Sequence, residues 1–360
     1  MKKLAIYIPS IEAGGVEKNL FYISAYLLKK NIDLTIITAN RNKKIFFDNR
    51  INFICPRNDK WNNSSRLIKT LICLGLIITK LPLKKISILS FQSNISAIII
   101  SKIFNLKIII RLNTSTDKYI NNFIKKYFFR IVYSMSDKII VNSLEFKKNL
   151  KDALKLNSIK IFNPIKKINN NRRSKIGYFS DYKGLKIMSI GRLTDQKDQI
   201  TILKSLNILK KKKINFRFFL IGSGYKFDKL NEYIKIHNLS NFIKLAGYKS
   251  NAFNYIDCSD LFILSSKFEG LPNVLIEAQL MNIPVISSNC STGPKEILLN
   301  GKLGSLFKVG DYVALSKIIL SFYKDKKFYL KKTKLAKKYL YRFDFEKNLN
   351  KYYNIILKIL

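Results

Sequence analysis

Two glutamates eight residues apart, in a segment that runs from a buried strand into a helix, give the clearest chemical signal in the sequence. Glu269 follows the apolar run Leu261–Ser265, at the carboxyl end of an expected strand, where open α/β sheets bind ligands. Glu277 is expected on the helix Pro272–Met281, with its side chain tilted toward the helix N-terminus and the same pocket. The free N–H groups around Leu271–Val274 can bind a phosphate. Two carboxylates suited to sugar hydroxyls would therefore flank a phosphate site.

A simpler interpretation of the two glutamates remains open. A glutamate close to a helix start is favoured by the helix dipole, and a second one in mid-helix can face solvent without any ligand. The spacing alone favours this simpler interpretation, so the ligand hypothesis depends on the residues around the two carboxylates.

A second loop between a strand and a helix contains two cations. Arg192 and Lys197 follow the expected strand Lys186–Ile190 and precede the expected helix Asp198–Lys211. An arginine binds a diphosphate as a planar fork and a lysine binds it as a compact charge, so both can act as clamps in a cleft between domains. Any two basic residues would be unremarkable among 66, but these two share one loop.

Gly14 and Gly15 lie between the first expected strand, Leu4–Ile8, and the first expected helix, Val16–Lys30. Paired glycines let the backbone approach a ligand closely, beside the positive end of a helix. The G-x-G-x-x-G fingerprint is absent here, Ile221–Lys226 lacks its third glycine, and the sequence has no G-x-x-x-x-G-K-[ST] motif. Hydride transfer on a dinucleotide and ATP hydrolysis by a P-loop are therefore disfavoured.

The elements that must position these residues alternate along the chain. Short runs rich in Ile, Leu and Val recur between longer segments of helical periodicity, which is the pattern of βαβ units around parallel sheets. The 360 residues suffice for about two domains. We expect an α/β chain with two Rossmann-like, doubly wound domains at 1–165 and 186–340, a polar linker at 166–185, and a C-terminal helix at 341–360 that packs back on the first domain. The cleft between two such domains is a natural ligand site.

The other expected strands are Leu34–Thr38, Ile86–Phe91, Lys107–Arg111, Lys138–Asn142, Arg217–Ile221, Ile243–Ala246 and Pro284–Ser287. A helix is expected at Asn251–Cys258, and the stretch from Lys326 to Leu360 is expected to be largely helical.

Charge and hydropathy narrow the possible partners. Lys and Arg number 66 against 23 Asp and Glu, a formal net charge of +43 that is spread over both halves and predicts attraction to polyanions. Two explanations remain open: a general bias in amino-acid usage, or an anionic membrane surface or substrate. No apolar run is long enough to cross a membrane, and four dispersed cysteines predict buried free thiols. We therefore expect a cytoplasmic protein, with any membrane contact peripheral and on the inner face of the cytoplasmic membrane.

The segment Tyr119–Tyr133, within the expected helix Asp117–Ser134, interleaves basic and aromatic side chains. This composition is typical of a helix on an anionic membrane surface. It also suits a helix that packs on the core and turns one basic face to solvent, and the sequence slightly favours that second interpretation.

Four motifs occur together and in order: GGVEK at 14–18, IGRLTDQKD at 190–198, EGLPNVLIE at 269–277 and GPKEIL at 293–298. In this combination the sequence resembles the retaining, nucleotide-sugar-dependent GT-B glycosyltransferases of family 4, from Met1 to about Leu306 and at a C-terminal helix similar to the family's cross-over helix. EGLPNVLIEA together with the upstream GRL and Lys197 is specific, whereas GG or GPKE alone is weak. The resemblance implies two Rossmann-like domains that face each other across a cleft.

The resemblance also implies roles for individual residues. Arg192 and Lys197 would hold the donor's diphosphate and stabilise it as it leaves, and Glu269 would contact the hydroxyls of the donor sugar. Glu277 would bind the ribose. Further donor contacts are implied at Gly14, Gly15, Gly224, Tyr248, Gly270, Leu271, Pro272, Asn273 and Val274, with Ser223 and Lys249 also near the base. Neither a metal nor a cofactor is expected, since the sequence has no D-x-D motif and retention in this family uses the donor diphosphate as the base.

One feature departs from the family pattern. Many relatives place a histidine of the first domain near the donor sugar, whereas the sole histidine here, His237, is expected on a helix of the second domain as a surface or half-buried residue.

The implied function is transfer of a hexose or N-acetylhexosamine from a UDP-sugar to a cell-envelope glycan, in lipopolysaccharide or capsule assembly, or to a polyprenyl-diphosphate-linked acceptor. Two alternatives of other classes are a basic nucleic-acid-binding protein and a sugar-nucleotide epimerase of GT-B-like architecture. The even spread of charge and the absence of a recognised binding module disfavour the first, so nucleic acid is not an expected partner. The shortage of acid/base side chains disfavours the second.

Overall fold

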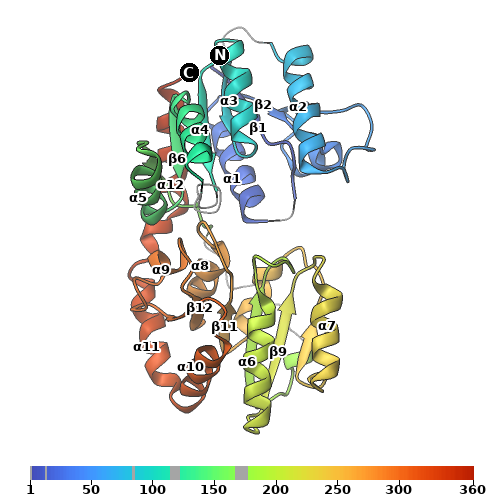
Figure 1. Cartoon of the computed structure of the whole chain (residues 1–360), viewed down its shortest axis with the longest axis vertical. Helices are drawn as coiled ribbons and strands as arrows, with labels where there is room; N and C mark the ends of the chain where they lie inside the picture. Colours follow the sequence, from blue (N-terminus) through green and yellow to red (C-terminus); the bar gives the residue numbers. More distant parts are fainter. Residues whose placement is uncertain (1, 13, 83–85, 114–121, 167–176) are drawn as a thin grey trace. The chain divides into compact units, whose positions relative to one another are not determined.

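The computed structural model describes residues 2–12, 14–82, 86–113, 122–166 and 177–360. The chain divides into two compact α/β units, one formed by Met1–Pro164 with Phe343–Leu360 and the other by Ile165–Arg342 (Figure 1). Some predictions fall outside the described residues: the start of the helix expected at Asp117–Ser134, with the corresponding part of Tyr119–Tyr133, and residues 167–176 of the expected linker.

The N-terminal unit is built on a parallel sheet of seven strands, in the order β3-β2-β1-β4-β5-β6-β7. The strands are β1 (Lys3–Tyr7), β2 (Asp33–Ile37), β3 (Asn52–Ile54), β4 (Ile86–Ser90), β5 (Ile108–Leu112), β6 (Lys138–Val141) and β7 (Ile159–Lys160). The central strands are buried on both faces, which is why they read as nearly continuous runs of Ile and Leu.

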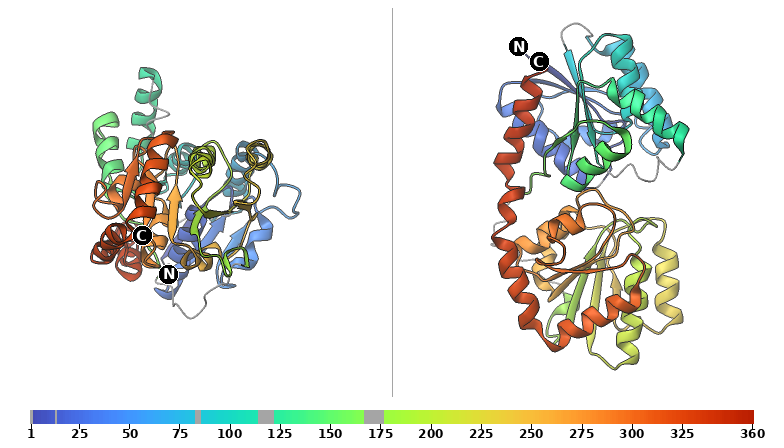
Figure 2. Two further views of the ribbon diagram at one scale, coloured as in Figure 1. Left: turned by 90° about the horizontal axis from the view of Figure 1, so that it is seen from below. Right: turned by 60° about the vertical axis from the view of Figure 1, so that its left-hand side comes forward.

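Helices cover both faces of this sheet (Figure 2). Because alternate strand side chains point to opposite faces, Ala5 and Tyr7 of β1 enter one core, and Leu4 and Ile6 enter the other. The first core is closed by α2 (Arg66–Lys80), α3 (Asn94–Ile103), α4 (Phe123–Ser134) and α5 (Leu144–Leu154). The second is closed by α1 (Gly15–Lys29) and α12 (Phe345–Leu357). The C-terminal helix is therefore part of the N-terminal unit.

The C-terminal unit contains a parallel sheet of six strands, in the order β10-β9-β8-β11-β12-β13. The strands are β8 (Leu185–Ile190), β9 (Phe216–Ile221), β10 (Ile243–Leu245), β11 (Leu261–Leu264), β12 (Val285–Ser288) and β13 (Ser305–Phe307). Its helices are α6 (Gln199–Lys211), α7 (Phe227–Ile236), α8 (Asn273–Leu280), α9 (Pro294–Ile297), α10 (Tyr312–Lys324) and α11 (Lys326–Lys337). A core around Ile187 of β8 packs against α6, α7 and α10.

Both sheets share one topological feature. The first strand of each unit lies in the middle of its sheet, with β1 between β2 and β4 and β8 between β9 and β11. The loop that leaves this strand and the loop that leaves its later neighbour, β4 or β11, run to opposite faces of the sheet. Doubly wound sheets bind ligands at this switch point, beyond the carboxyl ends of the two strands. Each unit therefore has one position at which a ligand site is expected.

Several elements differ from the sequence-based expectation. The sequence does not predict β3, β7 or β13, because strands of two or three residues carry no readable periodicity. It also misses α10. The helix expected at Asn251–Cys258 is a 3-10 helix, Ala252–Cys258. Within the expected linker, Phe179 is buried with its ring centroid 5.9 Å from that of Phe219 in β9, so this part belongs to the C-terminal unit.

The C-terminal helical stretch is interrupted. A 3-10 turn at Leu340–Phe343 separates α11 from α12. A new helix begins after it because the Asp344 carboxylate accepts from the N–H of Lys347 at 2.8 Å and caps α12.

The cysteines and the histidine follow the predictions in part. All four cysteines are free thiols, but only Cys73 and Cys290 are buried, whereas Cys55 and Cys258 are half-buried. His237 is half-buried as expected, with its ring centroid 4.1 Å from that of Tyr233.

Candidate functional site

The predicted cations and carboxylates of the C-terminal unit meet at its switch point. The loop after β8 carries Arg192 and Lys197, and the loop after β11 carries Glu269. Since β8 and β11 pair side by side in parallel, their carboxyl ends deliver these two loops to the same edge of the sheet. Residues more than 70 positions apart are thereby brought together.

Lys197 and Glu269 form a buried ion pair. The Lys197 ammonium donates to Glu269 Oε1 at 2.5 Å, and the Ser266 hydroxyl donates to the same oxygen at 2.6 Å. The side chains of Lys197 and Glu269 are only 16% and 8% exposed. The short distance and the low exposure make this a charge-assisted contact protected from solvent screening.

Hydrogen bonds between the two loops fix the ion pair in place. The Ser265 hydroxyl donates to the Lys197 carbonyl at 2.9 Å, and the Gln196 side chain donates to the Phe268 carbonyl at 3.0 Å. The N–H of Lys267 donates to the Gln196 carbonyl at 2.8 Å. Sequence reasoning missed these supporting residues, because Ser and Gln in a polar loop give no signal until the pairing of β8 with β11 is known.

A third loop, after β12, supports Glu269 from its backbone side. The Thr292 hydroxyl donates to the Glu269 carbonyl, and the Ser288 hydroxyl donates to the Ser266 carbonyl at 2.6 Å. Gly293 has a φ of +86°, and a Cβ there would lie 2.4 Å from the Gly270 carbonyl oxygen. The glycine of the GPKEIL motif is therefore required for close packing against the loop that holds Glu269.

The N-terminus of α8 lies directly after this loop. The helix begins one residue later than predicted, with Pro272 in the capping position. Gly270, Leu271, Pro272 and Asn273 are buried and Val274 is half-buried, so the predicted amide segment forms one continuous, largely covered turn. The first N–H groups of any helix lack an acceptor within the helix itself, which makes this turn suitable for an anion.

Glu277 is buried on α8, with 5% of its surface exposed. The simpler interpretation of Glu277 as a solvent-facing residue is therefore wrong, although the sequence spacing alone favours it.

The remaining predicted residues are less closely tied to the ion pair. Arg192 is exposed in the same loop as Lys197. Tyr248 is 59% exposed in the loop after β10. Gly224, in the loop after β9, has a φ of +153°, and a Cβ there would lie 2.3 Å from the Leu193 carbonyl oxygen. It therefore packs closely against the loop after β8. Gly14 and Gly15 belong to the N-terminal unit.

The Cys290 thiol is a titratable group whose pKa depends on the charges of the ion pair. Burial and the negative charge of Glu269 raise the pKa of this thiol to about 12. Its Sγ–H donates to the Thr292 carbonyl at 3.7 Å, so it behaves as a neutral packing residue beneath the site.

Residues 172–339 match the model described as glycosyl transferases group 1, which covers the C-terminal unit with Arg192, Lys197, Glu269 and Glu277.

Three curated proteins are similar in sequence. The chain is 34% identical over 222 residues to an uncharacterized glycosyltransferase of Methanocaldococcus jannaschii, covering 57% of this chain and 55% of that protein. It is 26% identical over 305 residues to the amylovoran biosynthesis glycosyltransferase AmsD of Erwinia amylovora, covering 83% and 84%. It is 27% identical over 197 residues to the N-acetylgalactosamine-N,N'-diacetylbacillosaminyl-diphospho-undecaprenol 4-alpha-N-acetylgalactosaminyltransferase of Campylobacter jejuni, covering 52% and 51%. The chain thus spans about half the length of the first and third of these proteins.

Among solved structures, HepE of Anabaena in complex with UDP and glucose matches with a TM-score of 0.80 at 17% identity, over 99% of this chain and 100% of that one. At this identity the likeness is one of fold. It confirms the predicted class, a GT-B arrangement of two parallel sheets with flanking helices and a C-terminal cross-over helix.

Proposed function

We propose that this chain is a glycosyl transferase of group 1, the family whose model matches residues 172–339. As an enzyme of family 4, it would transfer a hexose or an N-acetylhexosamine from a UDP-sugar with retention of configuration. The proposed acceptor is a cell-envelope glycan of the capsule or lipopolysaccharide type, or a polyprenyl-linked precursor. The UDP and glucose bound by HepE support the donor, and the names of the amylovoran and diphospho-undecaprenol enzymes support the acceptor.

The buried Lys197–Glu269 pair beside the first turn of α8 is the observation that carries the proposal. A diphosphate needs cations and N–H donors, and both are supplied at one switch point. The cations are Lys197 and Arg192, and the donors are the backbone N–H groups of Leu271, Asn273 and Val274, since Pro272 has none. Both side-chain contacts of Glu269 use Oε1, and among the described residues none reaches Oε2, which leaves an acceptor oxygen for a hydroxyl of the donor sugar. We assign Glu277 to the ribose hydroxyls.

The proposed reaction needs no protein nucleophile. The bond between C1 of the sugar and the diphosphate oxygen breaks, and the acceptor oxygen bonds to C1 on the same face. The proton of the acceptor hydroxyl passes to an oxygen of the leaving diphosphate. Negative charge accumulates on that diphosphate, so the contribution of Arg192, Lys197 and the α8 amides is electrostatic. We propose that no metal is required.

We further propose that the N-terminal unit acts at an anionic membrane surface through α2, α3 and α4, which are neighbours on one face of the sheet (Figure 1). Phe123 and Ile124 of α4 are 81% and 74% exposed, and Lys125 and Arg130 on the same helix are exposed cations. Apolar side chains beside cations suit a helix that lies in the headgroup region. Within the described parts of the chain, no helix combines the length and apolarity needed to cross a membrane.

Nucleotide binding tests the donor assignment. Thermal stability is measured with UDP, GDP and ADP, in buffer containing either EDTA or Mg²⁺, for the wild type and for Arg192→Ala and Lys197→Ala. Lys229→Ala is the matched control, because Lys229 is an exposed lysine of α7 in the same unit. A ligand at about 100 times its dissociation constant adds about 2.7 kcal/mol of stability.

We expect UDP to stabilise the wild type and the Lys229 variant, and to stabilise the two loop variants much less. Stabilisation by UDP only in the presence of a divalent cation would contradict the metal-independent proposal. No response to any of the three nucleotides would contradict the proposal of a nucleotide-sugar donor.

A further inference from the structure

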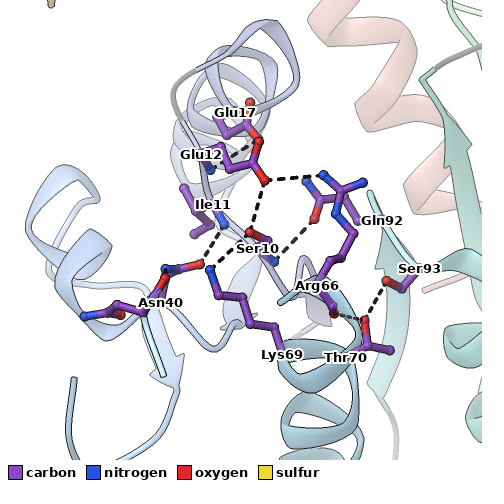
Figure 3. A network of polar contacts seen from close by, with 11 residues as sticks. Ser10, Ile11, Glu12, Glu17, Asn40, Arg66, Lys69, Thr70, Gln92 and Ser93 are labelled. Atoms are coloured by element: carbon purple, nitrogen blue, oxygen red, sulfur yellow. Dashed lines mark hydrogen bonds and ion pairs between the residues drawn. The ribbon is translucent and has the colours of Figure 1, made fainter. Parts of the chain in front are cut away.

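A second polar cluster lies at the switch point of the N-terminal unit, beyond the carboxyl ends of β1 and β4 (Figure 3). The N–H of Ser10, after β1, donates to the side chain of Gln92, after β4, at 3.3 Å. Asn40, after β2, accepts from the N–H of Ile11 at 3.0 Å. Loops from three neighbouring strands therefore converge here, and the first turns of α2 reach them from the side.

Lys69 of α2 points into this cluster and is buried, with 6% of its surface exposed (Figure 3). Its ammonium donates to the Ser10 hydroxyl at 3.4 Å, which is long for a hydrogen bond. Within the described residues it has no carboxylate partner in an ion pair. Desolvation lowers the pKa of Lys69. An ammonium has three N–H donors, and a buried one normally makes several short hydrogen bonds. Lys69 makes only one long contact, so two of its donors remain for a ligand.

Arg66, one turn earlier on α2, is the second cation of the cluster. Its Nη2 lies 3.4 Å from Glu12 Oε1, and its side chain is 58% exposed. A guanidinium has five N–H donors, and this single long contact uses only one of them. Arg66 therefore lies at the open side of the cluster and Lys69 at its buried side.

No carboxylate of the described residues forms an ion pair with Lys69, although the charge of Glu12 raises the pKa of Lys69 against the larger effect of desolvation. Glu12 is 41% exposed and faces Arg66, while Glu17 Oε1 accepts from the N–H of Glu12 at 3.4 Å in the first turn of α1. The Ser10 hydroxyl is the group between Glu12 and Lys69, at 3.5 Å and 3.4 Å from them. The arrangement thus leaves one buried positive charge, with hydroxyl and amide groups around it.

The frame that holds the two cations is well defined. The Ser65 side chain caps α2 by accepting from the N–H of Ile68. The hydroxyls of Thr70 and Ser93 are 2.8 Å apart and join α2 to the start of α3. Because Thr70 directly follows Lys69, this contact fixes the helix turn that carries the buried ammonium.

We propose that Lys69, together with Arg66 and the Ser10 hydroxyl, binds an oxyanion carried by the acceptor, either a phosphate or a carboxylate. The inference rests on the proposed function, since it assigns the anion to the acceptor and not to the donor. In this site Lys69 provides the compact charge and Arg66 provides fork-like donors at the open side. The Ser10 hydroxyl, which donates to Glu12 Oε1 at 3.5 Å in this structure, would turn to donate to the bound oxygen.

Titration calorimetry of the full chain tests this assignment. The probes are inorganic phosphate and three hexoses that differ in their anionic group: glucose 6-phosphate, glucuronate and glucose. UDP is present at saturation, so that the donor's phosphate site is filled. The variants are Lys69→Met, which keeps the buried stem, and Arg66→Gln, at a mostly exposed position. Lys80→Met is the matched control, because Lys80 is an exposed lysine at the other end of α2.

We expect at least one anionic hexose to bind the wild type more tightly than glucose does. Whichever of glucose 6-phosphate and glucuronate binds more tightly shows whether the site prefers a phosphate or a carboxylate. Lys69→Met should weaken that binding by about tenfold, as expected for the loss of a charge-assisted hydrogen bond, and Arg66→Gln should weaken it as well. Lys80→Met should leave it unchanged, and all variants should keep the UDP affinity of the wild type.

Equal affinities for glucose and both anionic hexoses would overturn the inference. So would equal losses in Lys69→Met and Lys80→Met, which would indicate general attraction to the basic surface. If the wild type does not bind UDP, the proposed function is contradicted and not this inference. The anion site is then tested by comparing how tightly the Lys69→Met and Lys80→Met variants bind the anionic hexoses without UDP.

Discussion

Arg111 donates a hydrogen bond from Nε to the hydroxyl of Tyr352 at 2.8 Å and so joins β5 to α12 across 241 residues of sequence. Arg111 is only 1% exposed, its Nη2 donates to Asn163 at 2.8 Å, and its guanidinium lies 5.3 Å from the ring centroid of Phe91. Within the described residues no carboxylate pairs with it. The buried charge is therefore balanced by neutral groups alone, and each hydrogen bond to it supports the attachment of the C-terminal helix.

Removing the Tyr352 hydroxyl should loosen that attachment. Tyr352→Phe keeps the ring but leaves the Arg111 Nε–H without its acceptor, so we expect the free energy of unfolding to fall by about 1–3 kcal/mol. Tyr353→Phe is the control, because Tyr353 is half-buried on the same helix and its hydroxyl makes no hydrogen bond to any described residue. Urea denaturation measures both. Equal stability of the two variants would show that the buried guanidinium does not depend on Tyr352.

Two glycines should respond to alanine in opposite directions. In Gly224→Ala the new Cβ would lie 2.3 Å from the Leu193 carbonyl oxygen at a φ of +153°, so the loop must shift and stability should fall. Gly75 lies in the interior of α2, and a Cβ added there would have open space around it, with no neighbouring atom within 4 Å. Gly75→Ala should therefore raise the free energy of unfolding by about 0.5–1 kcal/mol, measured by the same denaturation. A neutral Gly224→Ala would contradict the close packing of the two loops.

The sequence predicts the central strands to within one residue of their observed ends, because buried parallel strands form continuous apolar runs. It also predicts Lys197 and Glu269 as candidate site residues, because each follows such a run, and the structure brings these two side chains together. Their direct contact, however, depends on the pairing of β8 with β11, which no local pattern encodes. The support of Glu269 by Ser266 and Thr292 is invisible for the same reason.

Lys69 illustrates a second limit of sequence reasoning. It is one of 66 basic residues, and it belongs to none of the motifs that the sequence analysis singles out. Only the convergence of the loops after β1, β2 and β4 buries it. The burial of Glu277 is likewise decided by packing around α8 and not by its spacing from Glu269.

The Lys197–Glu269 pair should show strong coupling in a double-mutant cycle. Lys197→Met leaves the Glu269 carboxylate buried without its cation, which we expect to cost about 3 kcal/mol of unfolding free energy. In Lys197→Met combined with Glu269→Gln, no unpaired charge remains, so the double variant should be more stable than the sum of the two single effects implies. Denaturation of the four proteins measures the coupling energy. Additive effects would mean that the two side chains act independently.

Cys290 should make the fold sensitive to alkaline pH. Its pKa is raised to about 12 in the folded chain from an ordinary value of 9.0, so between these values the unfolded thiol loses its proton and the folded one keeps it. The unfolded state then binds fewer protons, and the free energy of unfolding falls as pH rises, by about 1.4 kcal/mol per pH unit. Cys290→Ala should flatten the decline between pH 9 and 12 by this amount. Parallel pH profiles of the two proteins would contradict the raised pKa.

The exposed apolar residues of α4 should control binding to anionic vesicles. Phe123→Ser combined with Ile124→Ser removes two large side chains at positions 81% and 74% exposed, so the free energy of unfolding should change by no more than about 0.5 kcal/mol per site. Binding to vesicles of phosphatidylglycerol and phosphatidylcholine, measured by sedimentation, should weaken by about tenfold or more, because the variant no longer buries apolar surface in the headgroup region.

A matched pair in the C-terminal unit separates this effect from general hydrophobicity. Ile236 and Phe328 are 66% and 50% exposed, and their replacement by serine should leave vesicle binding unchanged. Because neither double variant alters the net charge, both should keep the salt dependence of the wild type, which reports the contribution of the basic residues. Equal losses in the two double variants would mean that the vesicles adsorb the protein without regard to α4, and the membrane-facing role of that helix would have to be abandoned.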